Sequence, residues 1–196
     1  MVASELIDIL VPAFLPCAGF KTACSQANWN PLCGNVLRGF VGASGDLKEV
    51  EIILVIAEPG NPQRDEVYYE NEKPRELLAR TTQYVYECYD SKRDEFHRNV
   101  RYFLDCVYPT LDFCQQMRRV WITESYLCSA KKECGPIKAN AERECSRRYL
   151  EPELRLFPER PIVAFGLKAQ KRINNGGSTD LNNKNYKGVE PVPTRI

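Results

Sequence analysis

Histidine is nearly absent from this chain, and its scarcity limits the chemistry that the protein can perform. His97 is the only histidine among 196 residues. A mechanism that needs two histidines, or a zinc site rich in histidine, is therefore excluded. His97 falls among the polar positions of a predicted helix, so we expect a surface residue rather than a catalyst.

Long apolar runs are also missing. No run approaches the ~20 residues that a membrane-spanning helix needs. Glu5 and Asp8 interrupt the apolar start of the chain, and no basic region precedes it. That start therefore does not match a secretory signal. We expect a cytoplasmic protein that has no membrane partner.

A large net charge is lacking too, since the formal charge is only +1. This balance argues against nucleic-acid binding by the whole surface, although it leaves room for a local basic face. Basic side chains collect near the end of the chain, as Lys168, Lys171, Arg172, Lys184, Lys187 and Arg195. Composition alone leaves open whether they form a solvated tail or a binding surface.

The length and the composition suit one globular domain over residues 1–196, with 43% hydrophobic and 27% charged residues. Residues 15–48 are rich in Cys, Gly, Asn and Pro, so residues 1–48 are expected to form an irregular N-terminal segment. Residues 174–196 are expected to form a basic loop that could end in a short helix.

Three short apolar runs are typical of buried strands, and they lie at 50–57, 120–127 and 161–166. Apolar residues at helical spacing predict helices over 74–89, 93–107, 138–150 and 167–173. Strands that alternate with helices pair in parallel. The expected fold class is α/β, with three α/β/α layers around a short, mainly parallel central sheet.

Nine cysteines, an odd number, favour core thiols or metal ligands over a disulfide framework. Three of them fall on predicted helices, and we expect these to lie in the core: Cys88, Cys106 and Cys114.

Three ordered segments together resemble the motifs of one family. Residues 54–60 (LVIAEPG) read as a strand and a turn containing Pro, and residues 122–128 (ITESYLC) as a central strand leading to a cysteine. Residues 145–150 (CSRRYL) and 161–169 (PIVAFGLKA) read as a helix, a strand and a G-x-x-A turn. The set resembles the uracil-DNA glycosylase superfamily, and it is most similar to the branch that holds an iron–sulfur cluster.

The resemblance implies a DNA glycosylase of base excision repair. Such a hydrolase removes uracil or another deaminated base after flipping it out of DNA. DNA that contains a deaminated base is the implied partner, and we expect a monomer associated with the nucleoid. No lysine occupies a convincing nucleophile position, so water is the expected nucleophile and no lyase step is expected. Two alternatives stay open: a catalytically weak lesion- or DNA-binding protein of the same fold, and an iron–sulfur protein unrelated to DNA.

Glu58 is the expected catalytic residue. It follows the first predicted strand at its carboxyl end, where ligands bind in open α/β sheets. Hydrolysis of an N-glycosidic bond gives the sugar oxocarbenium character, and a carboxylate can position the water and stabilise that charge. The alternative for Glu58 is a helix cap or an exposed side chain. Ala57, Pro59 and Gly60 are expected to form the surrounding turn, with the Gly60 amide directed at the base or a phosphate.

Glu124 lies where the family commonly has an asparagine that reads the base. A carboxylate only accepts hydrogen bonds, whereas a protonated carboxyl group also donates one. As a carboxylate, Glu124 predicts an altered or broadened base choice. Alternatively, a raised pKa would keep Glu124 protonated, so that it could donate a hydrogen bond to the base. A structural ion pair with an arginine is the remaining alternative.

Further contacts with DNA are expected from residues of several segments. Tyr69, or its neighbour Tyr68, could stack on a flipped base, and packing is the alternative for both. Lys168, at a predicted helix start, is expected to meet a phosphate. The family motif with His-Pro-Ser has no counterpart here. In its place stand the amides of Asn182, Asn183 and Asn185, which either bind the base or form a loop without function.

The resemblance also implies a [4Fe–4S] cluster held by four thiolates. Cys128 and Cys145 stand where the iron–sulfur branch has two of its ligands. Cys17 and Cys24 would complete the set, with Cys33 as an alternative. If the cluster has been lost, these cysteines are expected to pack as small hydrophobic residues.

Overall fold

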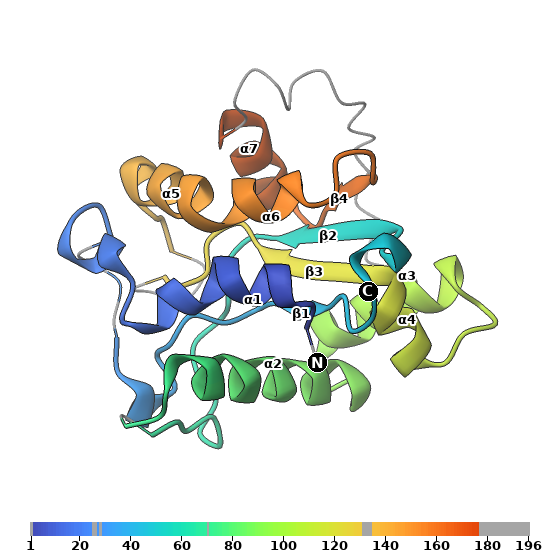
Figure 1. Ribbon diagram of the computed structural model, residues 1–196, viewed down its shortest axis with the longest axis horizontal. Helices are drawn as coiled ribbons and strands as arrows, with labels where there is room; N and C mark the ends of the chain where they lie inside the picture. Colours follow the sequence, from blue (N-terminus) through green and yellow to red (C-terminus); the bar gives the residue numbers. More distant parts are fainter. Residues whose placement is uncertain (1, 25–26, 28, 70, 131–134, 177–196) are drawn as a thin grey trace.

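A mixed α/β fold, with a four-stranded sheet flanked by helices, is seen in the computed structural model (Figure 1). It describes residues 2–24, 27, 29–69, 71–130 and 135–176. The strands are β1 (Val41–Gly42), β2 (Ile52–Ile56), β3 (Val120–Glu124) and β4 (Ile162–Ala164). The α-helices are α1 (Ser4–Leu10), α2 (Pro74–Asp90), α3 (Glu95–Val107), α4 (Phe113–Arg119), α5 (Ala139–Cys145), α6 (Glu151–Arg155) and α7 (Leu167–Gly176).

The sheet has the order β1-β3-β2-β4. β2 pairs in parallel with β3 on one side and with β4 on the other, while β1 adds an antiparallel edge beside β3. The three strands that the sequence predicts, and their parallel pairing, are confirmed. The two-residue strand β1 was not predicted, because it lies in a segment rich in turn-forming residues.

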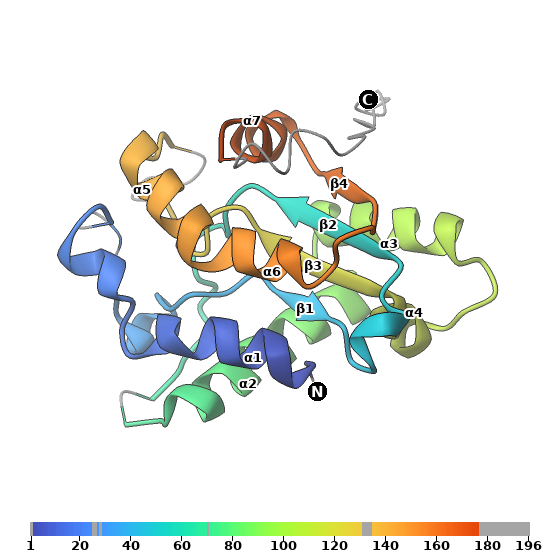
Figure 2. The ribbon, with the colours of Figure 1, turned by 45° about the horizontal axis from the view of Figure 1, so that its top comes forward.

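The connections place helices on both faces of the sheet (Figure 2). The chain crosses from β2 to β3 in one direction, through α2, α3 and α4, and from β3 to β4 in the opposite direction, through α5 and α6. Because such crossovers are right-handed, opposite directions put their helices on opposite faces. The loops after β2 and β3 therefore diverge, and they leave a crevice at the carboxyl ends of these two strands.

Two hydrophobic clusters, one on each face, confirm this layering. Along β2, Ile53 and Val55 pack into one cluster, while Leu54 and Ile56 pack into the other, as strand geometry requires. The first cluster contains residues of α1, α5 and α6, and the second contains residues of α3 and α4. α2 contributes to both clusters.

The helices largely follow the sequence pattern. α3 lies within its expected range and α2 ends one residue beyond its own. Asp94 caps α3 by accepting a hydrogen bond from the backbone N–H of His97 at 3.0 Å. The helix expected over 138–150 is α5 followed by the π-helical turn η5 (Ser146–Leu150). The chain then continues directly into α6, which has Pro152 in its first turn. α1 and α4 were not predicted.

The N-terminal segment is mostly irregular, as expected, although α1 gives it one helix. Between α1 and β2 the chain runs through short 3₁₀ turns, η1 (Val11–Phe14), η2 (Ala18–Lys21), η3 (Pro31–Cys33) and η4 (Leu47–Glu49). At the other end α7 extends to Gly176, and the remaining part of the expected basic loop lies outside the described residues. In the described ranges, none of the helices combines the length and the apolar character that a membrane span requires.

The expectation of three core cysteines on helices is wrong for two of them. Cys88 is buried, but Cys106 and Cys114 are exposed. Cys106 follows the buried Leu104 by two positions, which corresponds to about 200° around a helix and so to the opposite face. Cys114 lies on the outer face of the short helix α4, next to the buried Phe113.

Candidate active site

A cavity of about 520 Å³ lies at the carboxyl ends of β2 and β3, where the connections diverge. Its volume is within the range typical of ligand sites. Six of the site residues expected from the sequence line it together, namely Ala57, Glu58, Pro59, Gly60, Glu124 and Lys168. The structure therefore brings together residues from three segments that are far apart in the sequence.

Glu58 is buried at the edge of this cavity and makes ion pairs with two cations. Its Oε1 accepts a hydrogen bond from Lys168 Nζ at 2.6 Å, and its Oε2 accepts one from Arg172 at 2.6 Å. Arg172 also donates to Glu142 at 2.7 Å, so that a partly buried network fixes the orientation of Glu58. Arg172, which the sequence did not single out, lies one helical turn after Lys168 on α7.

Lys168 supports Glu58 within the chain. Its ammonium group binds Glu58 and the backbone carbonyl oxygen of Gly135 at 3.2 Å. The side chain is 43% exposed, so it contacts both the cavity and solvent. The geometry assigns it to the support of Glu58, and the contact with a DNA phosphate stays a prediction.

Glu124 is buried on the same cavity, and only 6% of the residue is exposed. Its Oε2 has no hydrogen-bond partner among the described residues. Burial, and after it the charge of Glu58, raise the pKa of Glu124 well above the ordinary value, although Arg38 and Arg172 act in the opposite direction. This shift favours the neutral carboxyl group. The expected alternative, a direct ion pair between Glu124 and an arginine, does not occur among the residues that the structure describes.

Gly39 makes room for Glu124. Its φ of +92° is a conformation that glycine adopts without strain. A Cβ atom at this position would lie 2.3 Å from Cγ of Glu124. The backbone at Gly39 therefore closes on the Glu124 side chain and helps to fix its position.

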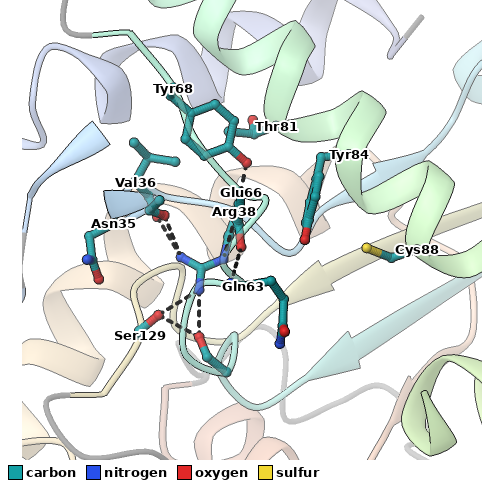
Figure 3. Close-up of polar contacts among 12 residues, drawn as sticks. Asn35, Val36, Arg38, Gln63, Glu66, Tyr68, Thr81, Tyr84, Cys88 and Ser129 are labelled. Atoms are coloured by element: carbon teal, nitrogen blue, oxygen red, sulfur yellow. Dashed lines mark hydrogen bonds and ion pairs between the residues drawn. The ribbon is translucent and has the colours of Figure 1, made fainter. Parts of the chain in front are cut away.

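Arg38 stabilises the turn after β2 (Figure 3). Its Nε lies 3.0 Å from Glu66 Oε1, and both residues are buried. Its terminal NH2 donates to the Gly60 carbonyl oxygen at 2.6 Å and to Ser129 Oγ at 2.9 Å. Since Ser129 also donates to the Gly60 oxygen at 2.7 Å, the Pro59–Gly60 turn is fixed from two segments.

The two candidate stacking tyrosines lie elsewhere. Tyr68 is buried, and its hydroxyl donates to Glu66 at 3.0 Å, within the Arg38 network (Figure 3). Tyr69 is 56% exposed, with the Arg80 guanidinium 5.2 Å from its ring centre, and it does not line the cavity. The expectation of stacking is therefore not supported for either side chain. Asn182, Asn183 and Asn185 lie outside the described residues.

His97, which the sequence places on the helix surface, lines the wall of the cavity. Its side chain is 19% exposed, and its Nδ1 lies 2.8 Å from Asp94 Oδ1. Tyr89 and Phe96 lie beside it on the same wall. The one sequence signal for this arrangement was Asp94, three residues before His97. An aspartate at that position is equally typical of a helix cap.

Four buried thiols gather in the first hydrophobic cluster, and they are the four expected as cluster ligands, Cys17, Cys24, Cys128 and Cys145. A Cβ atom on Gly19 would lie 3.2 Å from the sulfur of Cys24 and 3.4 Å from that of Cys17. Burial, followed by Cys145, Cys24 and Cys17, raises the pKa of Cys128 well above its ordinary value. The alternative ligand Cys33 is exposed and does not belong to the first hydrophobic cluster.

Two of these sulfurs accept backbone hydrogen bonds, from the N–H of Gly19 to Cys17 at 3.3 Å and from that of Leu127 to Cys145 at 3.4 Å. The Tyr149 hydroxyl lies 3.0 Å from Cys17 Sγ. The donor set suits a thiolate-bound cluster in number, burial and hydrogen bonding. As arranged, however, no group of three or more Cys, His, Asp or Glu side chains in the described ranges could hold a metal ion.

Comparison with known proteins assigns no family to this site. No protein-family model matches the chain, and no curated protein matches it either. The function of the cavity must therefore be inferred from its own residues.

Proposed function

We propose that this protein is a monofunctional DNA glycosylase of the uracil-DNA glycosylase type. It would hydrolyse the N-glycosidic bond of uracil, or of another deaminated base, after that base has been flipped out of DNA. The observation that carries the proposal is the pair of buried side-chain carboxyl groups, Glu58 and Glu124, in one cavity at the carboxyl ends of two parallel strands. Helices on both faces of the sheet are compatible with the three-layer fold of that superfamily.

Glu58 is suited to the sugar side of the reaction. The breaking bond leaves positive charge on the sugar, which a nearby carboxylate stabilises. Lys168 and Arg172 each bind one oxygen of Glu58, but a carboxylate has about four lone-pair sites. Glu58 can therefore also accept a hydrogen bond from the attacking water, and its two ion pairs hold it ready in one orientation.

Glu124 is suited to the base. A neutral carboxyl group presents one O–H donor and one acceptor, which is the same pattern as the amide of an asparagine. Its O–H can therefore donate a hydrogen bond to the carbonyl oxygen of a deaminated base, which stands next to a ring N–H. Because the acid proton can reside on either oxygen, we expect broader base choice than an amide would give, with hypoxanthine and xanthine included beside uracil.

The proposal includes a [4Fe–4S] cluster held by Cys17, Cys24, Cys128 and Cys145. When bound, the cluster would supply no bond-breaking chemistry and would join the N-terminal segment to the core. The four buried thiols support this part of the proposal. A brown protein with visible absorbance after anaerobic purification is the expected result, whereas a colourless protein with free thiols would contradict it.

A DNA-binding protein without glycosylase activity is the second candidate. The observation that favours it is the double ion pair of Glu58, since both oxygens already have cationic partners. In either case the expected partner is DNA with a deaminated base, bound by a monomer in the cytoplasm at the nucleoid.

One assay separates the two candidates. Single- and double-stranded oligonucleotides carrying uracil or hypoxanthine are incubated with excess protein, and abasic sites are then cleaved with alkali. We expect product from the wild type and a loss of about 10²- to 10⁴-fold in Glu58→Gln. Glu51→Gln is the matched control, because Glu51 lies at the opposite end of β2 in an exposed ion pair with Arg119. Tight binding without product would favour the DNA-binding protein, and no binding to any oligonucleotide would contradict both.

A further inference from the structure

We infer that His97 determines base specificity in the proposed glycosylase, by accepting a hydrogen bond at Nε2 from the ring N–H of a deaminated base. This inference rests on the proposed function. It names the class of ligand as heterocycles with a carbonyl oxygen beside a ring N–H, and it gives the only histidine of the chain a role at the cavity.

Asp94 fixes the hydrogen on the ring of His97. A carboxylate can only accept, so the 2.8 Å contact between Nδ1 and Asp94 Oδ1 places the hydrogen on Nδ1. Asp94 is held in turn, because its Oδ1 also accepts the backbone N–H of His97 at 3.0 Å. Burial raises the pKa of Asp94, but these bonds from His97 outweigh it and lower that pKa overall. In the neutral ring, Nε2 is then an acceptor.

Aromatic neighbours fix the plane of the ring. The Tyr89 ring lies 4.7 Å from that of His97 at an angle of 69°, and the Phe96 ring lies at 5.5 Å and 78°. Both are edge-to-face contacts, the arrangement that aromatic rings favour. Nε2 has no hydrogen-bond partner within the part of the chain that the structure describes. An oriented acceptor on a cavity wall is therefore available to a ligand.

Tyr89 links His97 to Glu124. Burial, and then Glu124 and Asp94, raise the pKa of Tyr89. Both carboxyl groups therefore lie within electrostatic reach of one phenol, which itself packs against His97. Glu124 and the His97–Asp94 pair line the same cavity. A base that enters it meets a carboxyl donor from β3 and an imidazole acceptor from α3.

This combination discriminates deaminated bases from their parents. Deamination replaces an exocyclic amino group by a carbonyl oxygen, and the adjacent ring nitrogen gains a hydrogen. Uracil and hypoxanthine then present an acceptor and an N–H donor, which match Glu124 and Nε2 of His97. In cytosine and adenine that ring nitrogen is itself an acceptor, and two acceptors that face each other leave a buried group without a partner.

The test uses two variants of His97 and measures single-turnover excision of uracil and hypoxanthine. His97→Phe keeps an aromatic ring against Tyr89 but has no acceptor, and we expect rates lower by on the order of 10- to 100-fold. His97→Gln supplies an amide oxygen that can accept a hydrogen bond, and we expect the excision rate to recover in part. Asn99→Gln is the control for the introduced side chain, because Asn99 is exposed on α3 and does not line the cavity. Equal rates in all four proteins would overturn the inference.

A spectroscopic measurement keeps this inference distinct from the proposed activity. Because the chain has one histidine, the ¹⁵N signal of Nε2 is unambiguous in the labelled protein. We expect it to shift with a duplex containing 2′-fluoro-deoxyuridine, which resists hydrolysis, and not with the same duplex containing deoxycytidine. A shift in a protein without excision activity would support the His97 contact and contradict the glycosylase. Excision without any shift would overturn the His97 contact alone.

Discussion

Two buried acids on opposite faces of the sheet show how differently one protein uses the same side chain. Glu124, at the end of β3, opens onto the cavity beside Glu58, whereas Glu153 on α6 is fully buried in the first hydrophobic cluster. Burial raises the pKa of both, and each has one carboxyl oxygen without a partner among the described residues. A raised pKa alone therefore does not identify a functional site. Glu124 differs from Glu153 because it lines a cavity together with a second carboxylate, Glu58.

Glu153 has a structural role in this comparison. Its Oε2 accepts a hydrogen bond from the indole N–H of Trp121 at 2.9 Å, and Trp121 is itself fully buried. A neutral glutamic acid satisfies that indole without placing a charge in the core. Glu124 has no such partner and faces space that a ligand can fill.

The largest expected effect concerns the ion-pair network that sets the cavity apart from the core. In Arg172→Met, Glu58 keeps a buried charge but loses its more buried cation, so the free energy of unfolding should fall by about 3–5 kcal/mol. Urea denaturation measures this loss. Arg119→Met, which breaks the exposed pair with Glu51, is the control and should cost only about 0–1 kcal/mol. Similar small losses in both variants would mean that the network does not stabilise the fold.

The second prediction tests the acid in the core through the pH dependence of stability. Burial, the first cause, raises the pKa of Glu153 from 4.5 to about 7, so the folded protein binds this proton more tightly than the unfolded chain does. Its contribution to stability is complete below about pH 4.5 and declines as the pH rises to about 7. The total decline is on the order of 3 kcal/mol. Glu153→Gln, which stays neutral, should remove this decline.

Urea denaturation of the wild type and Glu153→Gln at several values between pH 4.5 and 8 measures that difference. Glu159→Gln, an exposed substitution on the same connection, serves as the control and should leave the wild-type profile unchanged. Parallel profiles for the wild type and Glu153→Gln would contradict a neutral Glu153 in the folded protein.

The third prediction concerns the position of Glu124. Gly39→Ala places a methyl group against Glu124 Cγ and forces alanine into φ +92°, so we expect a loss of about 1–3 kcal/mol in unfolding free energy. Excision should fall as well, because Glu124 must move. Gly166→Ala is the control, since Gly166 has a similar φ of +90° but open space around its Cβ position. Equal effects on excision would show that contact with Glu124 is unimportant.

Local pattern predicts the frame of the molecule and part of its site. The β2 run is apolar and rich in β-branched residues, so the strand and the position of Glu58 at its carboxyl end follow from the sequence. Glu124 was singled out by the resemblance, because the predicted strand ran on to residue 127; β3 ends at Glu124, which places it at the same edge of the sheet as Glu58. α1 and α4 escaped prediction because seven residues give too few turns for a periodic pattern.

Contacts between distant segments could not be predicted in this way. Arg38 binds the oxygen of Gly60, 22 residues away, and the hydroxyl of Ser129, 91 residues away. No local spacing carries such information. The position of His97 at the cavity could not be predicted for a related reason, because a helix turns a polar residue toward solvent or toward a polar cavity with the same periodicity. The four cysteines were grouped by the resemblance alone, and the structure brings them into one part of the core.

The smallest expected effect separates the two roles of Asp94, which caps α3 and orients His97. Asparagine caps helices about as well as aspartate, so Asp94→Asn should change the unfolding free energy by less than about 1 kcal/mol, whereas Asp94→Ala should cost about 1 kcal/mol or more. The asparagine carbonyl can still accept from Nδ1, and the preference for uracil over cytosine should therefore fall only a few-fold in Asp94→Asn. In Asp94→Ala the ring loses its only hydrogen-bond partner in the described chain, and that preference should fall further. If both variants kept the full preference for uracil, Asp94 would be a helix cap only, and the cavity would read its base without an oriented imidazole.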